Sequence, residues 1–306
     1  MNKLKKFIAN WLVPPAVTQG IHEVLHREAL ALERAALEQA ALERAALEQA
    51  VLERAALEQA ALERAKNLPP IFINTLPKSG SVFISRSLSQ GLGIRNLPLS
   101  YGYFPYDLID INKIADLAKN GGTSQAHIDT SLMNLELLKY YCPKFIVHIR
   151  DPRQSMISWV HHINRLNQEL KYPNDRLILQ YSCPIVPDDF YEKPLSYQYD
   201  WHIENYFPLQ VEWLNQWISV RDKNSSLNIF LSQYEDFCID NETHILKILD
   251  FYGIPHEAYS QPKLEKNMSN HFRQGKVDEW RYVLTPEQQK KVSQTLTGPL
   301  LKYYSP

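Results

Sequence analysis

The stretch TLPKSGSVFISRSL, residues 75–88, follows the apolar run PPIFIN and leads into a helical pattern. It predicts a buried strand, a tight Ser-Gly turn that carries one lysine, and the start of a helix. Such a turn presents backbone N–H groups and the positive end of the helix dipole to a ligand. Ser79 and Gly80 let the backbone curl closely, while Ser81 adds a hydroxyl donor. Because Lys78 adds a mobile positive charge, the turn is predicted to bind a phosphate or a sulfate.

This turn differs from the G-x-x-x-x-G-K-[ST] loop of nucleoside-triphosphate-binding proteins, in which the lysine stands immediately before the helix. Here the lysine precedes the glycine, and the loop is too short to surround two or three phosphoryl groups. A short loop suits one phosphate that carries one further small anion. From this stretch alone, a strand-turn-helix with an exposed lysine remains the alternative.

A second polar constellation follows the strand-like run KFIVHIR, residues 144–150. Arg150 ends the run, and Ser158 lies about two turns into the helix that begins after Asp151-Pro152. An arginine at the carboxyl end of a strand is well placed for ligand binding in an open α/β sheet. Its planar fork can grip a phosphate with two hydrogen bonds, and a serine hydroxyl can add a third. The alternative is a capped helix start that binds nothing.

Residues 67–306 alternate between strand-like and helical patterns. Strands are predicted at 71–76, 144–150 and 227–234, and helices at 81–92, 131–141, 153–165, 208–220, 241–252 and 286–298. This alternation predicts one α/β domain whose parallel strands are joined by crossover helices. The stretch 166–200 is rich in Tyr, Pro and Asp and lacks clear periodicity. It is interpreted as a long surface excursion that serves as a lid or a substrate loop.

Residues 29–66 are built from the ten-residue unit ALERAALEQA. Ala, Leu, Glu, Arg and Gln are strong helix formers, so the repeat predicts a long helix. Its leucines recur every five residues, a step of about 140° on a helix, whereas a coiled-coil seam requires a repeat of about 3.5 residues. The preferred interpretation is a helical spacer, and self-association through the Ala/Leu surface is the alternative.

Residues 1–28 form an N-terminal segment whose first part, residues 1–15, has the pattern of a short amphipathic helix. The apolar residues at helical spacing are Leu4, Phe7, Ile8, Trp11 and Leu12. The preferred interpretation is a helix that docks on the protein's own core or on a partner subunit. The alternative is peripheral contact with a membrane surface through lysines and a boundary tryptophan. The segment lacks the long apolar core and cleavage site of a signal peptide.

The composition of the 306-residue chain excludes several classes of protein. Its net charge of −1 argues against a general nucleic-acid binder, which needs a basic excess to meet phosphates. Its three cysteines lack metal-site spacing, which fits a reducing compartment and argues against a zinc site. No apolar run approaches the roughly 18–20 residues that span a bilayer. The sequence therefore predicts a cytoplasmic protein without a metal. Peripheral membrane contact through residues 1–15 is the alternative.

The pair PKSGSVF and RDPRQSMIS resembles, in order and spacing, the two cofactor loops of the sulfotransferase family. That family uses 3′-phosphoadenosine 5′-phosphosulfate (PAPS), and the resemblance implies a P-loop-like three-layer α/β fold with a central parallel sheet. It also implies that the first loop holds the 5′-phosphosulfate, while Arg150 and Ser158 hold the 3′-phosphate. The residues implied in the first loop are Lys78, Ser79, Gly80, Ser81, Val82 and Phe83.

Further matches extend over most of residues 70–290. In the family, a basic-Gly segment near the C-terminus closes over the 3′-phosphate, and HFRQGKVDEWR is similar to it. The residues that fall in those places are Arg273, Gln274 and Gly275, and Trp280 matches the family's tryptophan. Tyr234, in a Tyr-Glu-Asp that follows a predicted strand, is implied to pack against adenine.

The chain departs from the family pattern at four positions. Val82 replaces a threonine, so only its backbone amide is left for the 5′-phosphate. Phe83 replaces a tryptophan and keeps an aromatic face for adenine. Gln274 replaces a basic residue, and Gln125 stands where many members have a lysine near the catalytic histidine.

The resemblance implies transfer of a sulfuryl group from PAPS to a hydroxyl or an amine of a small-molecule or carbohydrate acceptor. His127, 23 residues before Arg150, matches the family's catalytic histidine and is implied to take the acceptor's proton. Asp129 is the alternative base. Lys78 is implied to stabilise charge on the leaving oxygen. The implied catalytic residues are Lys78, His127 and Ser158, and no metal is needed.

Two other functions stay open on the sequence. A non-catalytic, sulfotransferase-like binding module is consistent with Val82 and Gln274. A P-loop kinase that uses ATP would need a triphosphate loop and a magnesium-binding acidic residue at a strand end, and neither is evident.

Overall fold

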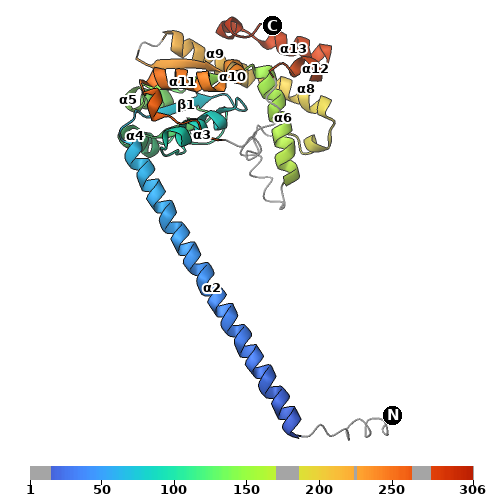
Figure 1. Cartoon of the computed structure of the whole chain (residues 1–306). Coiled ribbons are helices and arrows are strands. Elements are labelled where there is room, and N and C mark those ends of the chain that lie inside the picture. The colour runs from blue at the N-terminus through green and yellow to red at the C-terminus, as the bar shows by residue number, and fades with distance from the viewer. Residues whose placement is uncertain (1–14, 170–185, 224–225, 264–276, 306) are drawn as a thin grey trace, which may run out of the picture. The chain divides into compact units, whose positions relative to one another are not determined.

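A computed structural model of the chain describes residues 15–169, 186–223, 226–263 and 277–305 (Figure 1). The chain divides into two compact units, Met1–Gln59 and Ala60–Pro306. The first unit contains most of one long helix. The second contains the sheet and all the other helices that the structure describes.

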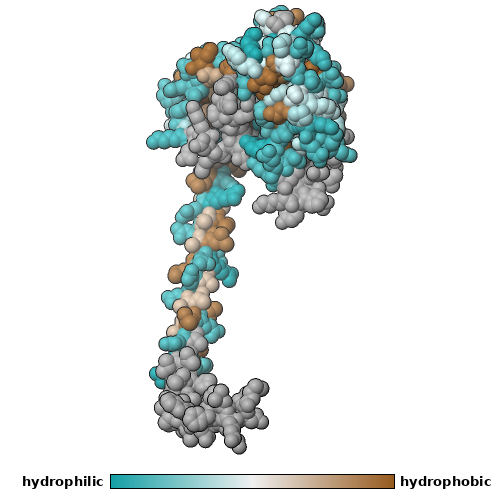
Figure 2. Space-filling view, turned by 90° about the vertical axis from the view of Figure 1, so that its right-hand side faces the viewer, coloured by the Kyte–Doolittle hydropathy of each residue, from teal (hydrophilic) through white to brown (hydrophobic). Residues whose placement is uncertain are grey.

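Helix α2 spans Pro15–Ala65, which confirms the helix predicted for the repeat. Its side chains form exposed ion pairs four residues apart, such as Arg44 Nε with Glu48 Oε1 at 3.0 Å. The leucines at five-residue steps from Leu32 to Leu57 are 65–72% exposed, and Leu62, near the end of the helix, is half-buried. Figure 2 shows apolar and polar residues mixed along this helix, without one continuous apolar stripe. The amphipathic pattern predicted at the N-terminus falls on residues 1–14, which lie outside the described residues.

The central sheet has four parallel strands in the order β4-β1-β5-β6. The strands are β1 (Ile71–Thr75), β4 (Thr123–Ala126), β5 (Lys144–Ile149) and β6 (Asn228–Gln233). Asn74 in β1 is aligned with Ala126 on one side and with Val147 on the other. The predicted parallel sheet is thereby confirmed, and its strands end along one edge.

Helices cover both faces of the sheet because alternate strand residues point to opposite sides. On one face, Phe72, Phe145 and Val147 pack into the larger apolar core, and on the other, Ile73 and Ile146 pack into a second core. The helices of the larger core are α4 (Ile111–Asn120), α5 (Leu132–Tyr141), α6 (Pro152–Glu169), α8 (Leu195–Asn205), α9 (Phe207–Lys223), α12 (Trp280–Val283) and α13 (Pro286–Thr295). The second core contains α3 (Ser81–Leu92), α10 (Tyr234–Ile239) and α11 (Asn241–Tyr252). The domain is therefore a three-layer α/β structure, as predicted.

The remaining described elements are short. Strands β2 (Ser100–Tyr101) and β3 (Leu108–Ile109) form an antiparallel hairpin. The described residues also contain three 3-10 helices: η1 (Phe190–Glu192), η2 (His256–Ala258) and η4 (Gly298–Lys302).

The interpretation of 166–200 as a surface excursion is wrong at both ends, although residues 186–194 connect helices and contain only the 3-10 turn η1. Its first residues belong to α6 and its last residues to α8. The buried side chains of α8 include Gln198, Tyr199 and His202, and Gln198 Nε2 donates to the carbonyl of Lys193 at 2.9 Å. The helix was missed because its buried side chains, apart from Ile203, are polar or aromatic and do not form an apolar periodicity.

The sequence also failed to predict β4 and α4. Strand β4 reads TSQA, without the apolar or β-branched run of a buried strand. Its polar groups are satisfied locally, since the Ser124 hydroxyl donates to the carbonyl of Leu97 at 2.7 Å. In the part of the chain that the structure describes, no helix combines the length and apolarity needed to cross a bilayer.

Candidate functional site

The turn after β1 has the backbone of a close-fitting loop. Residues 77–81, called the anion loop below, lie between the end of β1 and the start of α3. Lys78 has φ 62° and Gly80 has φ 75°, both in the left-handed region. Gly80 is the N-cap of α3, and its carbonyl accepts from the amide of Phe83 at 3.0 Å. The predicted strand-turn-helix is therefore present, and it is tighter than an ordinary connection.

Three consecutive carbonyls of the anion loop are hydrogen-bonded by side chains from β5 and its following segment. The carbonyl of Pro77 accepts from Ser155 Oγ at 2.6 Å. The carbonyl of Lys78 accepts from Arg150 Nη1 at 2.5 Å, and that of Ser79 accepts from His148 Nε2 at 2.8 Å. The carbonyl groups of the loop therefore face β5 and the segment that follows it.

The opposite edge of the same peptides presents their amides. In a trans peptide the C=O of one residue and the N–H of the next point in opposite directions. The amides of Lys78, Ser79 and Gly80 therefore point away from β5, as successive N–H groups do in an anion-binding nest. The Ser79 hydroxyl is buried and has no hydrogen-bond partner among the described residues. The loop thus offers backbone donors and one buried hydroxyl to an anion.

Arg150 and Tyr234 close one side of the loop. The guanidinium of Arg150 lies 3.9 Å from the centre of the Tyr234 ring, a cation–π contact. A Cβ atom at Gly80 would lie only 3.0 Å from Cε2 of Tyr234, so the ring packs directly on the glycine. Both side chains are at least nine-tenths buried, and burial raises the pKa of Tyr234 to about 12. The structure thereby brings together two of the residues predicted from separate motifs.

His127 follows β4, beside the end of β1. Its Nδ1 lies 2.7 Å from the carbonyl oxygen of Thr75. A carbonyl oxygen can only accept, so Nδ1 carries the proton, and Nε2 of the neutral imidazole carries the lone pair. The side-chain nitrogen of Gln125 lies 3.4 Å from Nε2. This tautomer leaves Nε2 in the state that a general base requires.

Charged neighbours act on His127 in opposite directions. Burial lowers its pKa most, the Thr75 carbonyl and the Asp107 carboxylate raise it, and the charge of Lys78 lowers it further. The net result is a pKa below the ordinary value of 6.5. The imidazole is therefore neutral at pH 7.

The chain after His127 is fixed rigidly. The carbonyl of Ile128 accepts from the indoles of Trp213 at 2.8 Å and Trp217 at 3.0 Å. Its amide donates to Asn74 Oδ1 at 2.9 Å. The two tryptophans are buried core residues, and they also hold the backbone next to the imidazole.

Asp129, the alternative base, has another task in the structure. Its Oδ1 accepts from the amide of Ser131 at 3.0 Å and from Nδ2 of Asn134 at 2.7 Å. These two bonds tie the carboxylate to the turn that precedes α5 and to the first turn of that helix. This engagement favours His127 over Asp129 as the base.

The other predicted cofactor residues are distributed as follows. Ser158 is buried in α6, and Ser81 is buried at the start of α3. Val82 and Phe83 are half-buried, and Phe83 packs on Phe237 with ring centres 5.6 Å apart. The positions Arg273, Gln274 and Gly275 lie outside the described residues.

The segment that follows those positions is docked beside the second motif. Trp280 is buried, and the guanidinium of Arg153 lies 3.9 Å from the centre of its ring. Its amide donates to Gln154 Oε1 at 3.2 Å. Arg153 in turn forms a buried ion pair with Asp151, with Nη2 to Oδ2 at 2.7 Å. The matched tryptophan therefore anchors the C-terminal segment on the start of α6.

Sequence reasoning missed three residues of this site, namely Asp107, His148 and Ser155. Asp107 Oδ2 accepts from the amide of His127 at 3.0 Å, and burial raises its pKa. His148 was assigned to an apolar strand, although an imidazole two residues before Arg150 was itself a signal. Asp107 gave no signal, because its link to His127 depends on the hairpin that the sequence did not predict.

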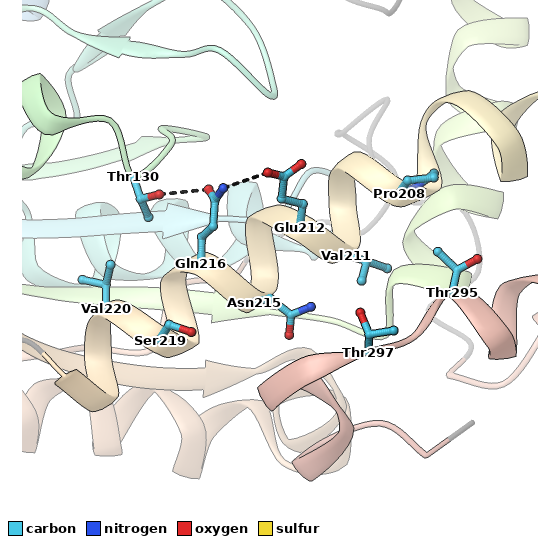
Figure 3. Close-up of a pocket in the computed structure, with 10 residues that line it drawn as sticks. All are labelled: Thr130, Pro208, Val211, Glu212, Asn215, Gln216, Ser219, Val220, Thr295 and Thr297. Carbon is cyan, nitrogen blue, oxygen red and sulfur yellow. Dashed lines mark hydrogen bonds between the residues drawn. The ribbon is translucent and has the colours of Figure 1, made fainter.

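A groove of about 600 Å³ lies along α9, and Thr130, Thr295 and Thr297 complete its lining (Figure 3). In it, Thr130 Oγ1 donates to Gln216 Oε1, and Gln216 Nε2 donates to Glu212 Oε1. The lining includes one carboxylate and no cationic side chain, so the groove does not suit an anion. It contains none of the predicted site residues. Among the described residues, no group of three or more His, Cys, Asp or Glu side chains could hold a metal ion.

Comparisons with known proteins agree with this geometry. The family profile described as "Sulfotransferase domain" matches residues 68–302. The crystal structure of mouse sulfotransferase SULT7A1 complexed with PAP is similar at 16% identity and a TM-score of 0.50, over 80% of this chain and 90% of that chain. At that identity the likeness shows a shared fold alone.

Two further solved structures are more distant. A sulfotransferase from Alicyclobacillus acidocaldarius is 11% identical, with a TM-score of 0.38 over 74% of this chain and 91% of that chain. The sulfotransferase domain from the curacin biosynthetic pathway is 14% identical, with a TM-score of 0.40 over 78% and 99%. No curated protein sequence matches the chain.

Proposed function

The chain belongs to the sulfotransferase domain family, and we propose that it moves a sulfuryl group from PAPS to a hydroxyl or an amine of an acceptor. The observation that carries the proposal is the pairing of the anion loop with His127. The loop offers amides and the Ser79 hydroxyl, and Nε2 of the His127 imidazole is in its basic, unprotonated form. Together they supply donors for an anion and a base that can remove a proton.

The anion loop is proposed to hold the 5′-phosphosulfate. Its amides and the positive end of α3 stabilise negative charge without moving during the reaction. Lys78 adds a full positive charge on a flexible side chain, which can stabilise the negative charge that develops on the leaving oxygen of the phosphosulfate. PAPS supplies the sulfuryl group, whose bond to the phosphate oxygen breaks as the bond to the acceptor oxygen or nitrogen forms.

His127 is proposed to take the acceptor's proton at Nε2 as the acceptor attacks. Its Nδ1–H bond to Thr75 fixes the ring and its tautomer. The imidazolium that forms faces the carboxylate of Asp107, which stabilises it, and the charge of Lys78, which opposes it. A positioned base of this kind contributes typically 10²–10⁴ in rate.

The 3′-phosphate is proposed to lie against Arg150 and Ser158, with Arg273, Gln274 and Gly275 closing over it. Arg150 is presented by the end of β5 and is stacked on Tyr234. Tyr234 and Phe83 are proposed to contact adenine. The acceptor is proposed to be a small molecule or a carbohydrate, and the protein is proposed to act in the cytoplasm, with residues 29–66 as a helical spacer.

Calorimetric titration of the whole chain with PAP, and separately with Mg-ATP, tests this function. We expect PAP to bind with micromolar or better affinity and Mg-ATP to bind far more weakly. Tight binding of Mg-ATP without PAP binding would replace the proposal with an ATP-dependent reaction. Binding of PAP with no turnover of PAPS on a broad acceptor panel would instead indicate a non-catalytic relative.

A further inference from the structure

The carbonyl of Ser79 in the anion loop meets a histidine that belongs to the sheet. His148 is completely buried in β5. Its Nε2 lies 2.8 Å from the carbonyl oxygen of Ser79, and its Nδ1 lies 2.7 Å from the hydroxyl of Ser232 in β6. That hydroxyl lies 2.7 Å from Nε2 of His244 in α11. Three buried polar side chains thus connect the loop to the helix layer of the second core.

Each proton in this relay has one allowed position. The Ser79 carbonyl can only accept, so Nε2 of His148 carries a proton. Burial lowers the pKa of His148 to about 3, so its ring is neutral and its Nδ1 must accept. The hydroxyl of Ser232 therefore donates to Nδ1 and accepts from Nε2 of His244. The relay runs His244 to Ser232 to His148 to the loop, with every bond directed toward Ser79.

A directed relay can position a backbone. The peptide between Ser79 and Gly80 could otherwise rotate, because glycine adopts many conformations at little cost. With its carbonyl held by His148, the Gly80 amide faces away from β5, toward the side where an anion would bind. Fixing donors before the ligand arrives lowers the entropy lost on binding.

We infer that the buried relay of His244, Ser232 and His148 holds the anion loop in its ligand-binding shape, which makes His148 a positioning residue for the 5′-phosphosulfate. This inference rests on the proposed function for the identity of the ligand. It goes beyond that function because none of the three relay residues is among those proposed to contact the ligand. Their effect is exerted through the Ser79–Gly80 peptide.

The experiment compares two buried histidines. His148→Leu removes both hydrogen bonds of the relay at similar volume, whereas His148→Gln keeps an amide N–H that can donate to the Ser79 carbonyl. His202→Leu is the matched control. His202 is also completely buried and donates Nδ1 to a backbone carbonyl, that of Gln198 at 2.9 Å, but in α8. PAP affinity by calorimetry and thermal unfolding are measured for the wild type and the three variants.

We expect His148→Leu to weaken PAP binding about tenfold or more, and His148→Gln to restore it to within about threefold of the wild type. His202→Leu is expected to lower the unfolding temperature while leaving PAP affinity within about twofold. Equal PAP affinity in His148→Leu and His202→Leu would overturn the inference. If His148→Leu does not fold, Ser232→Ala takes its place, since it removes the link behind His148 without a large cavity, and unchanged affinity there has the same meaning.

A second readout separates this inference from the proposed function. If the wild type does not bind PAP, the proposed function fails, and the same variants are titrated with inorganic pyrophosphate, which probes the loop alone. Weaker pyrophosphate binding in His148→Leu than in His202→Leu would still support the relay, and equal binding would overturn it. Absence of binding to both ligands in the wild type would overturn both proposals.

Discussion

The guanidinium of Arg150 lies 3.9 Å from the centre of the Tyr234 ring. These residues are 84 positions apart, and each directly follows the end of a strand, Arg150 after β5 and Tyr234 after β6. The two strands are neighbours in the sheet. The contact desolvates the cation on one face while its Nη1 holds the carbonyl of Lys78. Arg150 therefore serves both the loop that precedes α3 and the wall beside it.

Arg150→Ala is expected to lower PAP affinity at least tenfold. Its loss removes charge-assisted hydrogen bonds worth about 1.5–3 kcal/mol each, and the carbonyl of Lys78 loses its donor. Calorimetry measures the change. Arg95→Ala is the control, because Arg95 pairs with Asp116 at 2.6 Å and takes no part in the site. Equal affinity in the two variants would remove Arg150 from the cofactor site.

His127→Ala is expected to retain PAP affinity within about threefold and to lose roughly two to four decades of turnover. Turnover is measured with PAPS and an acceptor found by screening. Asp129→Ala provides the comparison. Since Asp129 Oδ1 accepts from the amide of Ser131 and from Asn134 Nδ2, the loss of these bonds should cost about 1 kcal/mol of stability and little activity. If instead turnover falls by two to four decades in Asp129→Ala, then Asp129 and not His127 is the base.

Asp107→Asn is expected to move the acid limb of the pH–rate profile to lower pH. The base must be neutral to act, so activity rises as the pH passes through its pKa. The Asp107 carboxylate raises the pKa of His127, and removing that charge lowers it. The amide oxygen of Asn can still accept from the amide of His127, so the backbone contact is kept.

The control for this shift is Asp110→Asn. Asp110 caps α4 through the amide of Asn112 at 2.8 Å, and asparagine caps helices nearly as well. Its pH–rate profile should stay in place. A profile that does not move in Asp107→Asn either would show that another group controls the acid limb.

Gly80→Ala is expected to destabilise the fold and to abolish tight PAP binding. Its φ of 75° costs an alanine about 1–2 kcal/mol, and the new methyl would lie 3.0 Å from the Tyr234 ring. Gly253→Ala is a matched control, with φ 73° and no atom within 4 Å of the added methyl. Thermal unfolding of the pair separates backbone strain from the clash. Similar unfolding and similar PAP affinity in both would mean that Tyr234 moves aside without consequence.

The sequence predicted the helices and strands whose burial depends on apolar side chains. The ranges 81–92 and 241–252 coincide with α3 and α11, because isoleucine and leucine mark their buried faces. Helix α8 and strand β4 were not predicted, since hydrogen bonds of amides, hydroxyls and imidazoles satisfy their buried groups. A local sequence pattern indicates apolar burial, but it does not indicate which distant residue will form a hydrogen bond with a buried polar group.

The site divides in the same way. Lys78, Gly80 and Arg150 stand in short motifs whose chemistry can be recognised along the chain. Asp107 and His148 act across 20 and 69 positions of sequence, on His127 and on Ser79 respectively. Their roles depend on the alignment of strands, which no single stretch of sequence contains.

The ten-residue unit of α2 has a geometric consequence of its own. Each unit adds about 15 Å of helix and turns it by about 280°. Because the leucines are distributed around the helix with no preferred side, a gained or lost unit changes the length of the rod without misaligning any face. Insertion or deletion of whole units in the sequence would therefore change the length of the spacer while its surface keeps the same composition.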